Sequence, residues 1–500
     1  MFRIFFSVLL LSSFLLTGCR EKKSDTATSA LPSGRPNILF IFIDDLRPEA
    51  GCYGNSLMVT PAIDRVAAEG VCFTGQFVTV PTCGASRYSM LTGRLPRSLA
   101  ALSNEACHTF IANKPEGERS VTFFERLRKA GYYTVGIGKI SHYADGHVYP
   151  YDGTPEGAPL ELPGSWDEML FNPGKWGTGW NAFFGYADGS NRNGRNKMVK
   201  PYERGNVDDT GYPDGLTAQL ALKKLKELAR KKQPFALAVG FFKPHLPFNS
   251  PAKYWDLYDE SSLPLTPSPD IPKNVNPASL HQSPEFNQYK LGEEHPSLTH
   301  PVSDAYARKL RHAYFAAVSY TDAQIGKLLD ELDELGLNDN TIVILWGDHG
   351  WHLGDDRVWG KHTIFEWALR SLFIVRAPGY ARNATCDKIV SSIDIYPTLL
   401  ELCKLPDDPS LDGKSLVPLL RNPQAPQWTN AAYSYYRHGI SLRTARYRLT
   451  RYFRPEQPVI ELYDHHTDPY ENVNIAGDHP EIVNKLMPLW QKGNTGLYEK

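Results

Sequence analysis

Cys83 stands where a cysteine can do chemistry. It follows Pro81 and Thr82, and the small Ala85 and the cationic Arg87 come two and four residues later, in a predicted helix. The start of a helix offers free backbone N–H groups and the positive end of the helix dipole, which suits an anionic ligand. Arg87 lies one turn further on, so its side chain can return towards Cys83. A buried structural thiol and one half of a disulfide are the alternatives for a cysteine taken alone.

Two acidic clusters far apart in the sequence form a second candidate site. Asp44 and Asp45 end one apolar run, and Asp348 and His349 follow another. Open α/β sheets bind their ligands at the carboxyl ends of their strands, so the two clusters are expected to meet there. Several carboxylate oxygens suit a hard divalent cation such as calcium, for which histidine is a less usual ligand. A pair of aspartates alone is more often a turn or a helix cap.

The elements that must position these residues alternate between strands and helices. The predicted strands are apolar runs over residues 36–43, 132–138, 234–242 and 341–346. The predicted helices cover residues 60–70, 121–131, 217–231 and 305–335. This alternation predicts an α/β fold with a mostly parallel sheet sandwiched by helices. Residues 149–214 are rich in glycine, proline, tryptophan and asparagine, and we expect them to form long loops around a site.

The overall composition is that of a large globular protein. Its 500 residues include 54 basic and 55 acidic side chains, so no basic field would attract nucleic acid. We expect a main α/β domain over residues 36–414. From residue 415 to residue 500 the pattern changes to short β segments, which predict a smaller C-terminal α+β subdomain with an antiparallel sheet.

The motifs together resemble those of the type I sulfatases, in which the cysteine of the pattern C-x-[P/A]-x-R is oxidised after translation to formylglycine. Further motifs stand in the order found in iduronate-2-sulfatase-like enzymes, across nearly the whole chain: Asp44-Asp45-Leu-Arg-Pro, Gly51-Cys-Tyr-Gly54, Leu91-Thr-Gly-Arg94, Gly138-Lys139, Lys243-Pro-His245, Gly347-Asp348-His349-Gly350-Trp351 and Glu461-Leu-Tyr-Asp464. The resemblance implies an alkaline-phosphatase-like fold and a catalytic domain over residues 36–414. It also implies a calcium site made by Asp44, Asp45, Asp348, His349 and the modified Cys83. Many sulfatases have asparagine in place of His349.

The resemblance implies further roles, which agree with the needs of sulfate-ester cleavage. Positive groups must surround the sulfate, and an acid must stand beside the leaving oxygen. By resemblance, Lys139 and Lys361 hold sulfate oxygens, and His245 gives a proton to the departing sugar hydroxyl. Trp351 is expected to line the sugar pocket. Each of these residues taken alone is more simply explained as a solvated lysine, a loop histidine or a core tryptophan.

The same resemblance assigns the nucleophile's partners and its maturation. Arg87 steadies the formylglycine diol, Asp348 or calcium helps to deprotonate the attacking oxygen, and His142 is the base of the elimination that restores the aldehyde. Ala85 stands where animal members carry proline. The alanine form resembles bacterial sulfatases matured by an anaerobic radical enzyme, so a formylglycine-generating maturase is an expected partner.

The N-terminus predicts export. An apolar run over residues 4–16 is too short to span a bilayer permanently, and it ends in Leu16-Thr-Gly-Cys19, which resembles a bacterial lipobox. We expect residues 1–18 to be a lipoprotein signal peptide, Cys19 to carry the lipid, and residues 19–35 to be a flexible tether. The protein would then sit on a membrane surface in the bacterial cell envelope, in the periplasm or on the cell surface. An ordinary cleaved signal peptide is the alternative.

Export would permit disulfides among the remaining cysteines. Besides Cys19 and Cys83 these are five, an odd number, so at least one must stay unpaired among them. Cys386 and Cys403 are a plausible local pair.

The sequence therefore favours a sulfuric ester hydrolase that acts on a sulfated oligo- or polysaccharide. The 2-O-sulfate of a uronic acid in a glycosaminoglycan is the simplest substrate, and sulfated algal polysaccharides such as ulvan are also open. A phosphonate or phosphodiester hydrolase of the same fold is the alternative enzyme. A catalytically inactive, surface-anchored sugar-binding protein is the alternative from another class.

Overall fold

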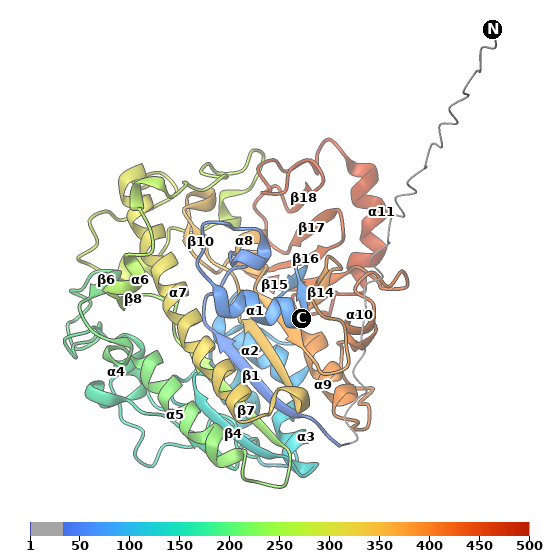
Figure 1. Ribbon diagram of the computed structural model, residues 1–500. Coiled ribbons are helices and arrows are strands. Elements are labelled where there is room, and N and C mark those ends of the chain that lie inside the picture. The colour runs from blue at the N-terminus through green and yellow to red at the C-terminus, as the bar shows by residue number, and fades with distance from the viewer. Residues whose placement is uncertain (2–33, 500) are drawn as a thin grey trace.

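The computed structural model describes Met1 and residues 34–499 (Figure 1). The predicted signal peptide, the lipid-bearing Cys19 and nearly all of the tether lie outside the described residues. Within the described part of the chain, no helix combines the length and the apolar character needed to cross a bilayer.

An eight-stranded sheet forms the centre of the molecule. Its order is β13-β2-β12-β9-β1-β7-β4-β5. The strands are β1 (Asn37–Ile43), β2 (Val71–Phe73), β4 (Tyr133–Gly138), β5 (Glu168–Leu170), β7 (Phe235–Phe241), β9 (Thr341–Gly347), β12 (Phe373–Arg376) and β13 (Ala384–Cys386). β1 pairs in parallel with β7 and with β9, and only the two pairings of β12 are antiparallel. The mostly parallel sheet predicted from the apolar runs is confirmed.

Helices cover both faces of this sheet because its central strands are apolar on both sides. The alternating side chains of β1 enter two separate cores, Leu39 and Ile41 on one face and Ile38 and Phe40 on the other. The first face is covered by α1 (Pro61–Glu69), α5 (Pro213–Leu228) and α7 (Asp304–Glu334). The second is covered by α2 (Cys83–Thr92), α3 (Phe123–Lys129), α9 (Ile395–Leu402) and α10 (Val417–Arg421). Figure 1 shows the long helix α7 crossing the near face.

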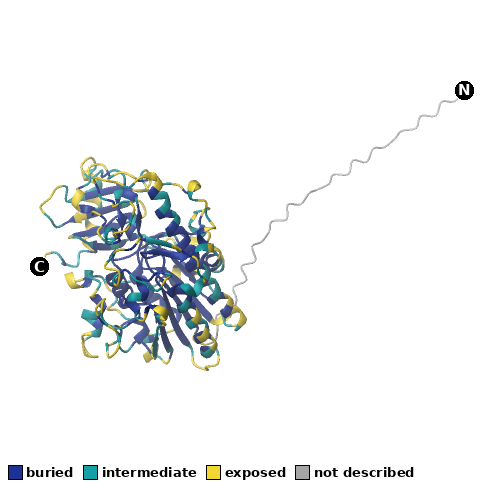
Figure 2. Cartoon of the chain, turned by 90° about the vertical axis from the view of Figure 1, so that its left-hand side faces the viewer, coloured by how far each residue is buried: buried dark blue, intermediate teal, exposed yellow. Residues whose placement is uncertain are grey.

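A second, antiparallel sheet follows in the C-terminal part. It contains β15 (Ala432–Tyr436), β16 (Gly439–Arg443), β17 (Tyr447–Tyr452) and β18 (Ile460–Asp464). Helix α11 (Pro480–Gln491) packs on it through the buried Trp490, whose Nε1 donates to the carbonyl of Ile440 at 2.8 Å. Figure 2 shows that the strands of both sheets are buried and that exposed residues concentrate in the surrounding loops. The predicted antiparallel C-terminal sheet is confirmed.

The segment predicted as loops contains only short elements, and it packs more closely than its composition suggests. Trp176, Trp180, Phe183 and Phe184 form an aromatic cluster with Phe242, directly after β7. The remaining short strands and α-helices of the described residues are β3 (Gln76–Phe77), α4 (Gly179–Phe183), β6 (Tyr202–Gly205), β8 (Phe248–Pro251), α6 (Ala252–Trp255), β10 (His352–Leu353), β11 (Trp359–Gly360), α8 (Glu366–Leu369) and β14 (Val390–Ser391).

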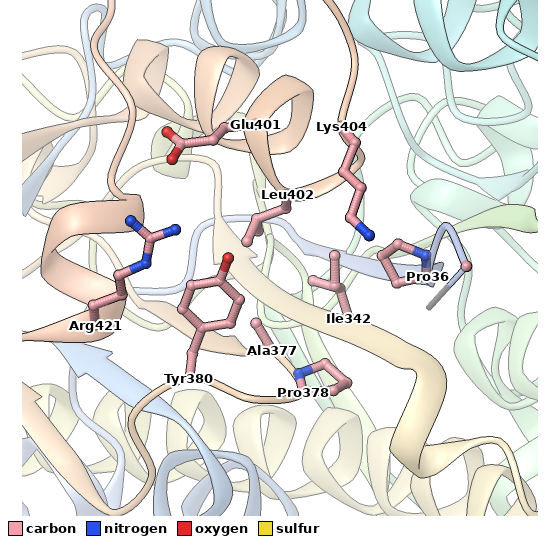
Figure 3. A pocket seen from close by; sticks show the side chains of 10 residues that line it. Pro36, Ile342, Ala377, Pro378, Tyr380, Glu401, Leu402, Lys404 and Arg421 are labelled. Atoms are coloured by element: carbon pink, nitrogen blue, oxygen red, sulfur yellow. The ribbon is translucent and has the colours of Figure 1, made fainter. Parts of the chain in front are cut away.

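A pocket of about 160 Å³ lies at the amino ends of the central strands (Figure 3). Pro36, just before β1, and Ile342, near the start of β9, line it together with Tyr380, Lys404 and Arg421. The acidic clusters follow the carboxyl ends of the same strands, so this pocket lies at the opposite edge of the sheet from them.

The plausible disulfide between Cys386 and Cys403 is not formed. Both are buried free thiols. Cys386 lies at the end of edge strand β13, where its Sγ is 3.4 Å from the carbonyl oxygen of Pro423. Cys403 ends α9 on the core side of the helix. The two cysteines are close in sequence, which suggested the pair. In the structure one lies on strand β13 and the other at the end of helix α9, and the thiols are not bonded.

Candidate active site

The two acidic clusters meet at the carboxyl edge of the sheet. Asp44 and Asp45 follow β1, and Asp348 and His349 follow the neighbouring parallel strand β9. The backbone N–H of Asp45 donates to Asp348 Oδ1 at 3.0 Å. All four side chains are fully buried. The convergence predicted from the two apolar runs is therefore found.

Cys83 begins helix α2 and points into this cluster. Its Sγ lies 3.3 Å from His349 Nε2 and 3.3 Å from Lys361 Nζ. Burial and the neighbouring Asp44 raise the pKa of the thiol to about 12. The next residue must be glycine, because a Cβ on Gly84 would lie 2.1 Å from the backbone oxygen of Asn104. That close approach fixes the turn that carries Cys83.

Arg87 joins the two strand ends from the next turn of α2. Its Nε donates to Asp348 Oδ2 at 2.8 Å, and its Nη2 lies 3.5 Å from Asp44 Oδ1. Its Nη1 donates to the backbone carbonyls of Lys139 and Ile140. The guanidinium is fully buried, as are both carboxylates. Its planar fork thus holds four groups from three segments of the chain.

Two lysines stand beside the aspartates. Lys139, directly after β4, pairs with Asp44 and lies 4.1 Å above the ring of Phe183. Lys361, after β11, donates to Asp45 at 2.9 Å. Burial alone would raise the pKa of Asp44, but the neighbouring Lys139, His245 and Arg87 together outweigh it and lower that pKa well below its usual value. Both lysines are almost fully buried, so they hold positive charge where water is largely excluded.

His245 faces the same site from the loop after β7. Its Nδ1 bonds the carbonyl of Leu246 at 2.6 Å, and its Nε2 lies 3.7 Å from Asp45 and 3.0 Å from Glu285. Since Nδ1 gives its proton to the carbonyl, the contact between Nε2 and the Glu285 carboxylate becomes a hydrogen bond only when the imidazole gains a second proton. Burial and Lys361 oppose that charge and lower the pKa of His245 to about 3.

Glu285 is a site residue that sequence reasoning missed. Its carboxylate also lies 3.3 Å from Lys361 Nζ, and its side chain is 18 % exposed, which places it at the open side of the site. It stands between α6 and α7, in a segment with no regular strand or long helix, so no periodicity or motif marked it.

Asp214 is a second site residue that sequence reasoning missed. Its carboxylate accepts hydrogen bonds from the backbone N–H groups of Phe242 and Lys243, both at 2.8 Å, and so fixes the loop that carries His245.

His142 and Trp351 occupy less central positions. His142 is 6 % exposed, its Nδ1 has no hydrogen-bond partner among the described residues, and burial lowers its pKa well below the usual value. Burial therefore favours the neutral form of this imidazole. Trp351 is fully buried behind Lys361, with its ring 5.1 Å from that Nζ. This placement suits support of the lysine, and direct contact between Trp351 and a sugar stays a prediction.

The donor set fits a divalent cation. The ligand atoms of Asp44, Asp45, Cys83 and His349 all lie within 4.8 Å of one another. Asp44 Oδ1 is buried without a hydrogen-bond partner among the described residues. His349 bonds the carbonyl of Gly350 through Nδ1 at 2.9 Å, which leaves its Nε2 lone pair directed at the cluster. Several carboxylate oxygens with at most one nitrogen donor match the preference of calcium.

Comparisons with known proteins agree with this site. Residues 36–405 match the sulfatase family, and residues 347–492 match the C-terminal region of N-sulphoglucosamine sulphohydrolase. A sulfatase of Formosa agariphila is 30% identical over 96% of this chain and 91% of its own length. Mouse iduronate 2-sulfatase is 27% identical (96% and 97%), and an ulvan-active sulfatase of Formosa agariphila is 28% identical (98% and 86%).

Solved structures show the same fold. A structure in complex with its substrate D-glucosamine-2-N,6-O-disulfate matches with a TM-score of 0.70 at 21% identity, over 92% of this chain and 97% of that one. A phosphonate monoester hydrolase from Silicibacter pomeroyi matches with a TM-score of 0.72 at 22% identity, over 92% and 95%. The chain belongs to the sulfatase family, and it is a sulfuric ester hydrolase with an alkaline-phosphatase-like fold.

Proposed function

We propose that this enzyme removes sulfate from a sulfated saccharide and that Cys83 is converted to formylglycine. The position of Cys83 carries the proposal: its Sγ lies between Lys361 and His349, in a buried cluster of opposite charges at a helix start. A nucleophile that attacks an anion requires nearby positive groups, whereas a structural thiol does not. The saccharide class is supported by the printed names of the iduronate 2-sulfatase and the ulvan-active sulfatase, and by the glucosamine-disulfate complex.

Two groups would complete the site. Formylglycine at position 83 would supply, as its hydrate, the nucleophilic oxygen. Calcium would supply positive charge beside that oxygen and would be held by Asp44, Asp45, Asp348, His349 and the modified residue 83. Arg87 would keep Asp348 and Asp44 in place for this purpose, since it contacts both carboxylates.

The sulfate would be bound by Lys139 and Lys361. Each ammonium carries three donors, so it can keep its aspartate contact and still donate to a sulfate oxygen. Both lie in a largely water-excluded site, where their charge acts more strongly on the transition state than it would in water.

Two histidines would move protons. His245 would donate from Nε2 to the departing sugar oxygen, because its Nδ1 proton is already committed to the carbonyl of Leu246. Glu285 would position that proton, since its carboxylate lies 3.0 Å from Nε2. His142 would act as the base that resets the site, because its neutral ring keeps an unpartnered nitrogen.

Maturation and location form part of the same proposal. Ala85 in the Cys83 motif favours an anaerobic radical maturase, and the lipobox-like ending at Cys19 favours a lipid anchor on a membrane surface of the cell envelope. Labelling with a fatty-acid precursor would test the anchor. A cysteine-to-alanine change at Cys19 should abolish incorporation and release the protein from membranes.

The enzyme is best tested with and without a coexpressed maturase. Mass spectrometry of the tryptic peptide that contains Cys83 reports the converted fraction, and sulfate release is measured on a panel of defined sulfated saccharides. We expect activity to rise in proportion to the converted fraction and to vanish in C83A. Faster turnover of an aryl phosphodiester than of any sulfate ester would favour the phosphonate or phosphodiester hydrolase. A converted protein that binds these saccharides but releases no sulfate would be a binding protein.

A further inference from the structure

Arg192 is a buried cation for which the described residues supply no carboxylate partner. Seven arginines are buried among the described residues, and six of them have a carboxylate oxygen within 4.0 Å. Those six are Arg47, Arg87, Arg311, Arg376, Arg443 and Arg448. Arg192 is only 6 % exposed, yet no carboxylate of the described residues lies within that distance of it. A buried charge normally has a partner, because leaving it unpaired costs several kcal/mol.

This guanidinium stands beside the active site. It lies 3.5 Å above the ring of Phe184, and that ring is 6.5 Å from the ring of His245. The preceding residue, Phe183, lies between the catalytic groups, with its ring 4.5 Å from His245 and 4.1 Å from Lys139 Nζ. One aromatic ring therefore separates Arg192 from the proposed proton donor.

Most donors of Arg192 are free to meet a ligand. Its Nε makes a long contact of 3.4 Å to Asn193, and neither Nη nitrogen has an acceptor among the described residues. Both Nη nitrogens therefore keep some contact with solvent. Stacking on Phe184 compensates part of the cost of burying the charge, but it leaves the donor-bearing edge of the guanidinium unused.

The loop holds Arg192 in place before any ligand binds. The N–H of Arg192 donates to the carbonyl of Phe184 at 3.1 Å, and the carbonyl of Arg192 accepts from Lys197 at 2.8 Å. On its other side the guanidinium lies 5.5 Å above the ring of Tyr289, in the segment that also carries Glu285. Glu285 is the acidic group on this side of the site, and it is already engaged by His245 and Lys361.

An exposed aromatic ring completes the arrangement. Tyr151 is 46 % exposed, and its ring lies 5.9 Å from Phe184 and 4.5 Å from Trp180. Carbohydrate rings pack against such aromatic faces, and a fixed guanidinium recognises carboxylate and sulfate oxygens. The site thus joins a sugar-sized apolar contact to a second anion-binding group.

We propose that Arg192 binds a second anionic substituent of the substrate, a carboxylate or a further sulfate on the saccharide that carries the scissile ester. This inference rests on the proposed function of the site and narrows its substrate class to saccharides with at least two anionic groups. A saccharide whose only anionic group is the scissile sulfate would leave the guanidinium unpaired.

The test compares matched substrates. The first pair is a 2-O-sulfated uronate disaccharide and its carboxyl-reduced form, and the second is a disaccharide with and without a further 6-O-sulfate. The variants are R192Q, R192K and the control R195Q, which changes an exposed arginine three residues away in the same loop. The readout is the ratio of kcat/KM within each pair, so that a general loss of activity cancels. Thermal unfolding reports whether each variant is folded.

We expect the wild type and R195Q to prefer the more anionic member of one pair by about 10- to 100-fold, the range for a hydrogen bond to a charged group. R192Q should bring that ratio close to one, and R192K should keep an intermediate value and serve alone if R192Q does not fold. The responding pair distinguishes a carboxylate from a second sulfate. Sulfate release with the same ratios in the wild type and the Arg192 variants overturns this inference alone. No release from any saccharide by converted wild type overturns the proposed function as well.

Discussion

Replacing Arg87 with lysine tests whether its fork holds the two strand ends together. R87K keeps the positive charge but has a single nitrogen in place of three. The arginine reaches Asp348 at 2.8 Å, Asp44 at 3.5 Å, and the carbonyls that follow β4. One ammonium can keep only part of this set, so at least one buried carboxylate loses its partner.

The burial of these groups sets the magnitude. Arg87, Asp44 and Asp348 are all fully buried, and breaking a buried pair costs about 3–5 kcal/mol because it leaves an uncompensated charge. Retention of the charge places R87K at the low end, about 3 kcal/mol in the free energy of unfolding. The chain offers a matched control in Arg97, which makes two contacts of 2.7 Å to Asp412 but has a side chain that is 55 % exposed. R97K should cost less than about 1 kcal/mol.

Urea unfolding of both variants, with calcium held constant, measures the two free energies by linear extrapolation. Activity of the converted proteins on an aryl sulfate is followed in parallel. We expect kcat/KM to fall at least about 100-fold in R87K, since about 3 kcal/mol of positioning is lost, and to be unchanged in R97K. Equal destabilisation by the two changes would refute the reasoning, because a buried arginine that holds several groups should lose far more than an exposed one that pairs with Asp412.

Three other perturbations give separate expectations. Burial raises the pKa of Glu161 to about 7, so the unfolded chain releases this proton at lower pH than the folded protein, and stability falls as pH rises from about 4.5 to 7. The free energy of unfolding of E161Q, measured in urea, should therefore rise by about 2 kcal/mol relative to that of wild type between pH 5 and pH 8. A difference that stays constant with pH would contradict this. Chelation of calcium should lower both the unfolding temperature and sulfate release, with recovery on adding calcium back but not magnesium; unchanged melting would argue against a cation at the aspartate cluster. E285Q should lower kcat/KM about 10- to 100-fold and move the basic limb of its pH profile to lower pH, because the carboxylate no longer stabilises protonated His245; an unshifted profile would assign Glu285 a structural role.

The part of the site that follows regular elements could be predicted from the sequence. Asp44 and Asp348 each end an apolar run, and parallel strands bring their carboxyl ends to one edge, so the meeting of these residues follows from the fold class. Cys83 could be placed at a helix start from its small and polar neighbours. The motif order of the sulfatases then singled out Lys139, Lys361 and His245, whose positions no periodicity fixes.

The rest could not be predicted because it depends on tertiary contacts between irregular segments. Glu285 and Arg192 stand in segments without a repeating pattern, and each becomes significant only through a neighbour far away in sequence, His245 in one case and Phe184 in the other. The composition of residues 149–214 predicted loops, but it did not show that their tryptophans and phenylalanines form a buried cluster next to β7. The Cys386–Cys403 pair failed for the same reason, since spacing along the chain does not give the direction of a side chain.

Charge balance explains why such a site selects anions. Three buried carboxylates, Asp44, Asp45 and Asp348, are matched by three buried cations, Arg87, Lys139 and Lys361. These six side chains sum to zero, which a water-poor interior tolerates. A divalent cation held by the carboxylates would leave these six side chains and the cation with a surplus of two positive charges. A sulfate ester brings negative charge to this surplus. Arg192 would add one more positive charge beside the site, so affinity should grow with each anionic group that the saccharide carries.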